Sequence, residues 1–193
     1  MNLKSHIKIA LGYFFIVALL GVFLRMFHVV DTSLDYKNML HTHSHVALLG
    51  WIYTAITTLI YKCYLNKKSI KIYKVIFWST QVTIVGMLLT FPFMGYALFS
   101  ILFSTLFLIA SYFFVWFFLK HTSEEQKETN SYKLIRASLW FMVFSSLGPL
   151  ALGIIMNTLG SSSSWYRNAI YFYLHFQYNA WFFLALLGLL FFV

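Results

Sequence analysis

Histidine is the residue type whose spacing in this chain could support metal or haem chemistry. Three histidines stand within five residues, at positions His41, His43 and His45. Imidazole is the commonest side-chain metal ligand, and its neutral form carries no charge into a membrane. On a helix, residues 41 and 45 share one face, whereas residue 43 is rotated from them by about 200°. One face can therefore offer two imidazoles, or one ligand and a second residue that orients it.

A second polar group lies in a long apolar stretch near the other end of the chain. His175 is followed by Tyr178 and Asn179, at the spacings that share a helical face. Polar groups in an apolar helix are expected to point into the bundle and find partners there, and Gln177 belongs to the same set. A histidine cluster joined by a further histidine from another helix is typical of a metal or haem site.

A purely structural interpretation stands beside this one. Histidines occur at membrane interfaces, where the polar tip stays in water while the ring packs on apolar neighbours. His6, His28 and His121 are interpreted in this way. In the same interpretation, the polar residues near position 175 only make hydrogen bonds between helices.

Other kinds of chemistry find few candidate residues in the sequence. All five acidic residues fall in predicted loops, at Asp31, Asp35, Glu124, Glu125 and Glu128. A carboxylate proton relay inside the membrane is therefore not expected. Cys63 is the single cysteine, which excludes an internal disulfide and a thiolate metal cage.

The composition decides what must position these side chains. Of the 193 residues, 61% are hydrophobic and only 10% are charged, whereas a soluble domain carries about 25% charged residues. These values exclude a soluble domain, a disordered chain and a nucleic-acid-binding domain. We predict an all-α polytopic membrane bundle in one domain, residues 1–193. Six transmembrane helices are long enough for the roughly 30 Å of hydrocarbon, at about 8–28, 44–64, 72–93, 96–119, 134–158 and 168–193.

The basic residues alternate between the predicted loops and set the orientation. Most of them fall before the first helix, between the second and third, and between the fourth and fifth. The positive-inside rule then predicts a cytoplasmic N-terminus and a multi-pass protein of the inner (cytoplasmic) membrane. Pro149 is expected to kink the fifth helix. The last apolar run stops without a polar flank, so either this helix ends at the inner membrane surface or the chain is the N-terminal part of a longer protein, which is the interpretation we favour.

The two histidine segments resemble those of a known membrane enzyme family. The second predicted helix opens with Leu40-His41-Thr42, continues through Trp51 and closes at Tyr61. This pattern resembles helix II of the catalytic subunit I of the haem–copper oxidase superfamily, most nearly its nitric oxide reductase branch. His175 in the sixth helix resembles the metal-binding histidine of helix VI in that family. The chain is thus similar to the first six helices of such a subunit.

The resemblance implies redox chemistry on O2 or NO at a haem and a second metal, and hence an oxidoreductase if the chain is part of a complete subunit. A haem, of b type, would be bound by a histidine of the second helix. The Leu-His-Thr match points to His41 for this role, whereas the spacing to Trp51 favours His43 or His45.

The second metal, copper or non-haem iron, would be bound by His175 in the family resemblance. Asn179 and Tyr178 would lie beside it. Nitric oxide reductases have a glutamate one turn after this histidine, where this chain has Asn179. The remaining metal and haem ligands of the family come from later helices that this sequence does not include.

Two other functions fit the same residues. One is a six-helix membrane metal transporter, and the other is a non-catalytic haem-binding or assembly protein. The expected partners are membrane lipid, an electron-donor cytochrome or other subunit, and a second copy or the missing C-terminal half, with no nucleic acid. The haem interpretations all require that imidazoles of the second and sixth helices converge in one pocket near the outer membrane surface.

Overall fold

Helix is the regular structure throughout the described part of the chain. The computed structural model describes residues 3–65 and 69–192, and every regular element in these ranges is helical, which confirms the predicted all-α class. The elements are α1 (Leu3–Met26), α2 (Tyr36–His45), η1 (Val46–Tyr53), α3 (Thr54–Tyr64), α4 (Ile70–Met94), α5 (Leu98–His121), α6 (Glu124–Lys127), α7 (Asn130–Ser145), α8 (Leu147–Thr158), α9 (Ser164–His175), η3 (Phe176–Phe182) and α10 (Phe183–Leu190).

Five helices among the described residues are long and apolar enough to cross a membrane. They are Leu3–Met26, Tyr36–Tyr64, Ile70–Met94, Leu98–His121 and Asn130–Thr158, and they correspond to the first five predicted stretches. The sixth stretch is also helical, through α9, η3 and α10, but polar residues in its middle lower its hydropathy. A sixth span and a cytoplasmic N-terminus remain predictions.

The chain divides into two compact units, each of which is described by itself. Unit 1 comprises Met1–Phe118 and unit 2 comprises Leu119–Val193. Unit 1 therefore holds the three clustered histidines, and unit 2 holds His175. A single membrane domain over residues 1–193 remains a prediction.

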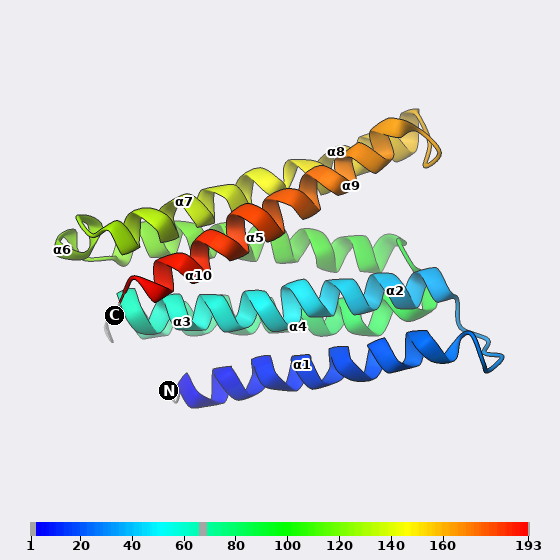
Figure 1. Cartoon of the computed structure of the whole chain (residues 1–193), viewed down its shortest axis with the longest axis horizontal. Helices are drawn as coiled ribbons and strands as arrows, with labels where there is room; N and C mark the ends of the chain where they lie inside the picture. The colour runs from blue at the N-terminus through cyan, green and yellow to red at the C-terminus, as the bar shows by residue number, and fades with distance from the viewer. Residues whose placement is uncertain (1–2, 66–68, 193) are drawn as a thin grey trace. The chain divides into compact units, whose positions relative to one another are not determined.

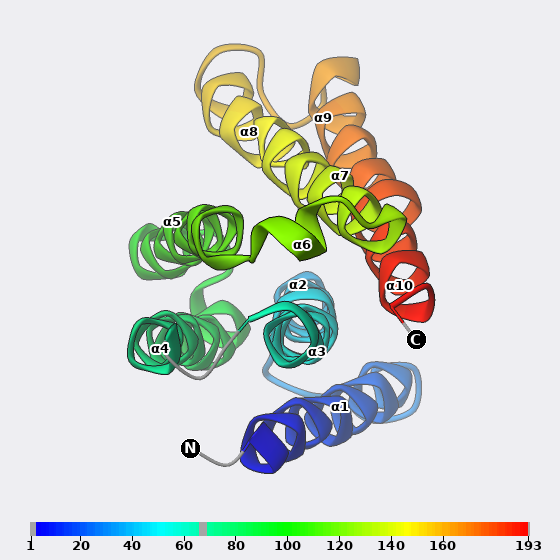
Figure 2. The same cartoon turned by 90° about the vertical axis from the view of Figure 1, so that its left-hand side faces the viewer.

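Unit 1 is built around the second membrane-length helix. The elements α2, η1 and α3 follow one another without a break and form a rod, Tyr36–Tyr64. In the most apolar stretch of this rod 61% of the residues are buried, against 17% in α1, and the rod packs against both α1 and α4 (Figure 2). Aromatic rings fill its contact with α4, where Tyr61 stacks on Tyr73 with ring centroids 3.8 Å apart.

Unit 2 is a pair of long helices, α7–α8 and α9–η3–α10, that lie side by side (Figure 1). Pro149 has no N–H to donate to the carbonyl of Ser145, and the first helix of the pair breaks between Ser145 and Leu147. This interruption lies one turn before Pro149, where the sequence predicts the kink. Glycine lets the two helices approach closely, because a Cβ built on Gly148 would lie 2.6 Å from the carbonyl oxygen of Ala169.

Replacing Gly148 by alanine is expected to destabilise unit 2 by about 1–3 kcal/mol, because the added methyl group overpacks the α8–α9 contact. Gly153 is the matched control, since it lies in the same helix and a Cβ built there meets nothing within 4 Å. Gly153→Ala should leave stability unchanged or raise it by up to about 1 kcal/mol. The measurement is the free energy of unfolding of the full chain in mixed micelles, and equal effects of the two substitutions would contradict the close contact.

Candidate functional site

The helix that carries the clustered histidines is fixed at its first turn. Asp35 caps α2, and its side chain accepts a hydrogen bond from the Asn38 N–H at 2.9 Å. The turn after α4 packs against this first turn of α2. The side-chain amide of Asn38 occupies the space that a Cβ on Gly95 would take. Gly95 has a φ of +56°, which only glycine adopts readily. This turn brings the next residue, Tyr96, against the histidines.

His41 and His45 lie on one face of α2, as their spacing predicts. The ring of His41 meets Tyr96 edge-on with centroids 4.8 Å apart, and the ring of His45 lies 6.0 Å from the same tyrosine. His45 also packs on Phe91 of α4, with ring centroids 4.5 Å apart. Both imidazoles are half-buried, so they are held by aromatic neighbours and not free in solvent.

His43 points to another side of α2, toward α1. Its Cε1 would lie 3.3 Å from a Cβ on Gly21, so α1 carries a glycine where the imidazole rests. Its Nδ1 is buried and has no hydrogen-bond partner in the described part of the chain. The three histidines therefore divide into a pair and a single residue, and a cluster in which all three bind one metal ion does not form.

Hydrogen bonding distinguishes the two imidazoles of the pair. The Nδ1 of His45 lies 2.8 Å from the carbonyl oxygen of His41, and because a carbonyl only accepts, Nδ1 must carry the proton. In the neutral ring, Nε2 of His45 then keeps its lone pair for another partner. The Nε2 of His41 is buried and has no partner among the described residues.

A π-helix begins directly after each of the two candidate histidine sites. The segment η1 starts after His45 and η3 starts after His175. Such segments widen the helix by shifting its hydrogen bonds from i−4 to i−5, and they occur frequently at functional sites. Neither segment is predicted by the hydropathy pattern of the sequence.

The matching π segments expose a repeat in the sequence. Residues 130 positions apart are identical at ten places, and four of these pairs lie in the two histidine segments: Tyr36 and Tyr166, Asn38 and Asn168, His45 and His175, and Trp51 and Trp181. The packing repeats as well, since Gly21 of α1 faces His43, and Gly148 of α8 faces Tyr173, which stands 130 residues after His43. Both segments thus combine a histidine, a π segment that follows it and a glycine on the preceding helix, and the spacing of His and Trp could have revealed this likeness.

The second predicted group is only partly buried in unit 2. His175, Tyr178 and Asn179 are exposed, and the Asn179 Nδ2 donates to the His175 Nδ1 at 3.2 Å. Gln177 behaves as expected for a polar residue in an apolar helix, because it is buried and its Nε2 donates to the Ser145 Oγ at 2.7 Å. The expectation that all the polar residues point into the bundle is thus met by Gln177, and within unit 2 it is wrong for His175 and Asn179.

Neither histidine group has the ligands for a metal site with several protein donors. Across residues 3–65 and 69–192, no three side chains of His, Cys, Asp or Glu gather closely enough to bind an ion. The convergence of the second-helix and sixth-helix imidazoles concerns both units and remains a prediction. Comparison with known protein families, with curated proteins and with solved structures finds no match for this chain.

The hydrogen bond between Gln177 and Ser145 can be measured by a double-mutant cycle. Ser145→Ala leaves the buried Gln177 amide unpaired and should cost about 1–3 kcal/mol, whereas Ser145 keeps its bond to the Met142 carbonyl when Gln177 is replaced by leucine. The double variant should therefore show a coupling energy of about 0.5–1.5 kcal/mol in unfolding experiments. Asn179→Leu, two residues along the same helix, is the exposed control, and additive effects of the pair would contradict the bond.

Proposed function

We propose that this chain is an integral membrane haem protein in which His45 is an axial ligand of a b-type haem. The observation that carries the proposal is the hydrogen bond of His45 Nδ1 to the His41 carbonyl oxygen, 2.8 Å long. Ligating histidines almost always donate their other ring N–H in this way, which fixes the tautomer and makes the free nitrogen more basic. The Nε2 of His45 is therefore the best prepared ligand atom of the cluster.

The number of available donors favours a haem over a bare metal ion. A transition-metal ion held by protein alone takes three or four side-chain ligands, and the described residues offer no group of three. A haem iron takes four ligands from the porphyrin, so the protein supplies only one or two. This difference counts against the metal transporter and supports the haem protein.

An unpaired atom on the same face as His45 also supports a bound group at this end of the rod. The Nε2 of His41 is buried without a partner among the described residues. Such an atom costs about 1–3 kcal/mol. A haem brings carboxylates, with ordered water around them, that can pair with imidazole N–H groups. His41 also positions His45 through its carbonyl oxygen.

When bound, the haem iron changes between Fe(II) and Fe(III) and can carry an electron or bind O2 or NO. The resemblance to the haem–copper oxidase superfamily extends the proposal to redox chemistry on one of these gases in the inner membrane, with an electron-donor cytochrome as partner. Copper or non-haem iron would then be bound at His175, with Asn179 and Tyr178 beside it. Because His175 Nδ1 accepts from Asn179, its Nε2 carries the ring proton and must lose it before binding a metal.

Haem content of the purified full chain tests the proposal. With haem supplied during expression, the wild type should show a Soret band and about one haem per chain by the pyridine haemochromogen assay. His45→Leu should lower the haem-to-protein ratio at least about tenfold, since the axial ligand is lost. His28→Gln is the matched control, because His28 is exposed and lies between α1 and α2, and it should keep the wild-type ratio.

The same samples separate the other functions. A wild-type haem content in the His45 variant, with loss in His41→Leu, would move the ligand to His41. Bound copper, iron or zinc without a Soret band would support the metal transporter, and neither haem nor metal would leave the histidines with structural roles. Haem without a second metal in the wild type would favour the non-catalytic haem-binding protein over the oxidoreductase.

A further inference from the structure

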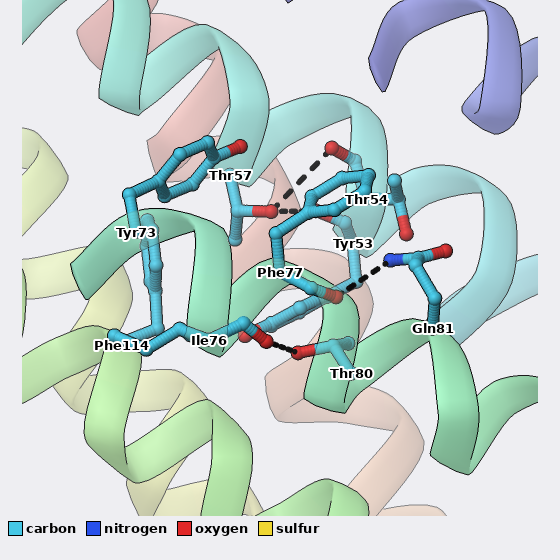
Figure 3. Close-up of a pocket in the computed structure, with 9 residues that line it drawn as sticks. All are labelled: Tyr53, Thr54, Thr57, Tyr73, Ile76, Phe77, Thr80, Gln81 and Phe114. Carbon is cyan, nitrogen blue, oxygen red and sulfur yellow. Dashed lines mark hydrogen bonds between the residues drawn. The ribbon is translucent and has the colours of Figure 1, made fainter. Parts of the chain in front are cut away.

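Three helices of unit 1 are joined by ring contacts at the end where α1 begins. His6 of α1 is interpreted as interfacial from the sequence, but it is 2% exposed, because its ring stacks on Phe77 of α4 with centroids 3.6 Å apart. The Nδ1 of His6 also lies 3.4 Å from the hydroxyl oxygen of Tyr73, and Tyr73 stacks on Tyr61 near the end of α3. Tyr73 and Phe77 also line a small cavity in unit 1 (Figure 3). The starts of α1 and α4 and the end of α3 therefore lie together.

Five exposed lysines surround this junction, and we call them the lysine end of unit 1. Two of them stand within two residues of His6, one directly follows Tyr61, and two stand within two residues of Tyr73. They are Lys4, Lys8, Lys62, Lys71 and Lys74. Because the three helix ends lie together, positive charges from three elements gather at one place on the surface. Like charges at short range repel one another, so the lysine end favours an anionic partner.

The opposite end of unit 1 carries balanced charges. Asp31 and Asp35 are the acidic residues of the sequence from 1 to 118, and both lie in the connection between α1 and α2. Arg25 and Lys37 stand on either side of them in the sequence, so two positive charges offset two negative ones there. The sequence of unit 1 thus provides no acidic residue to neutralise its lysine end.

The lysines also stand at the head of exposed apolar helix faces. On α1, Lys8 is followed on the same face by three apolar side chains, each more than half exposed: Leu11, Phe15 and Leu19. On α4, Lys74 is likewise followed on its own face by exposed apolar side chains. From Lys8 to Leu19 the helix rises about 17 Å, close to the roughly 15 Å that one leaflet contributes to the hydrocarbon core. A phospholipid has this same order, a charged headgroup followed by acyl chains.

We propose that the lysine end of unit 1 is a binding site for an anionic phospholipid of the phosphatidylglycerol type. The headgroup phosphate pairs with lysines of α1 and α4, and the acyl chains lie along the apolar faces that follow them. Groups of about four to eight basic residues beside a membrane-spanning helix attract anionic lipids, and each contributes a factor of about five in affinity near the membrane surface. A zwitterionic headgroup carries its own positive charge and gains much less. This inference does not depend on haem binding.

Lipid titration of the purified full chain tests the proposal. The protein in neutral detergent is titrated with dioleoyl-phosphatidylglycerol and, separately, with the phosphatidylcholine that has the same acyl chains. Native mass spectrometry then measures the affinity of the first bound lipid. Phosphatidylglycerol should bind at least about tenfold more tightly than phosphatidylcholine, and equal affinities would overturn the proposal. Millimolar inorganic phosphate should not displace the lipid, because it lacks acyl chains, and full displacement would instead assign the lysines to free phosphate.

Charge-removing variants locate the site on unit 1. The double variant Lys71→Gln and Lys74→Gln should lower the affinity for phosphatidylglycerol at least about tenfold and leave the affinity for phosphatidylcholine unchanged. The matched control is Arg25→Gln with Lys37→Gln, which removes the same charge from the balanced end and should keep the wild-type affinity within about twofold. An equal loss in the control would show attraction by net charge alone and would overturn the assignment to the lysine end.

The α1 side of the site is tested in the same way. Lys4→Gln with Lys8→Gln removes the two lysines beside His6 and should also lower the affinity for phosphatidylglycerol at least about tenfold. This variant keeps the proposal testable if the α4 variant does not fold. An unchanged affinity in both lysine variants would overturn the proposal.

Discussion

Hydrogen-bond satisfaction in an apolar surrounding is the constraint on which the rest of this structure depends. A membrane core supplies no water, so each backbone and side-chain polar group must find its partner within the protein. Helices satisfy their own backbone, and hydroxyl side chains such as Thr57 donate back to a carbonyl one turn earlier. Against this background, the unpaired buried atoms of His41, His43, Thr54 and Gln81 stand out. The two histidine atoms lie on different faces of α2, and Thr54 and Gln81 line one small cavity between α3 and α4.

The sequence predicts best what local physics decides. Depletion of charged residues predicts the membrane-length helices, and a proline without an N–H predicts the break before Pro149. The burial of a single polar side chain is not predicted in the same way, because it depends on which residues of another helix lie against it. His6 is buried because Phe77 of another helix covers it, and no residue near position 6 marks that partner. Gln177 is buried and Asn179 is exposed although both are polar residues of one turn, because only one of them faces the other helix of unit 2.

The histidines at both sites can be recognised in the sequence, but the helix packing and hydrogen bonds around them cannot. Individual matches are few and widely spaced, so no long run of identity draws attention to them. The structure relates them through packing, since glycines of α1 and α8 receive the residues at positions 43 and 173. Two helix pairs with the same plan then present different chemistry: His45 is oriented by a backbone carbonyl, and His175 is oriented by an amide side chain. His45 and His175 stand at equivalent positions of the repeat, yet their different hydrogen bonds leave the Nε2 of His45 with a free lone pair and the Nε2 of His175 with a proton.

The π segment η1 changes the angular phase of the rod between its two ends. Residues 45 and 61 would point about 160° apart on a regular α-helix, in which each residue advances by 100°. Yet both meet α4, where His45 packs on Phe91 and Tyr61 stacks on Tyr73. The wider turns of η1 absorb the difference, so one straight neighbour can support both the imidazole end and the aromatic end. The residues of η1 therefore act as a rotational spacer between the two ends of the rod.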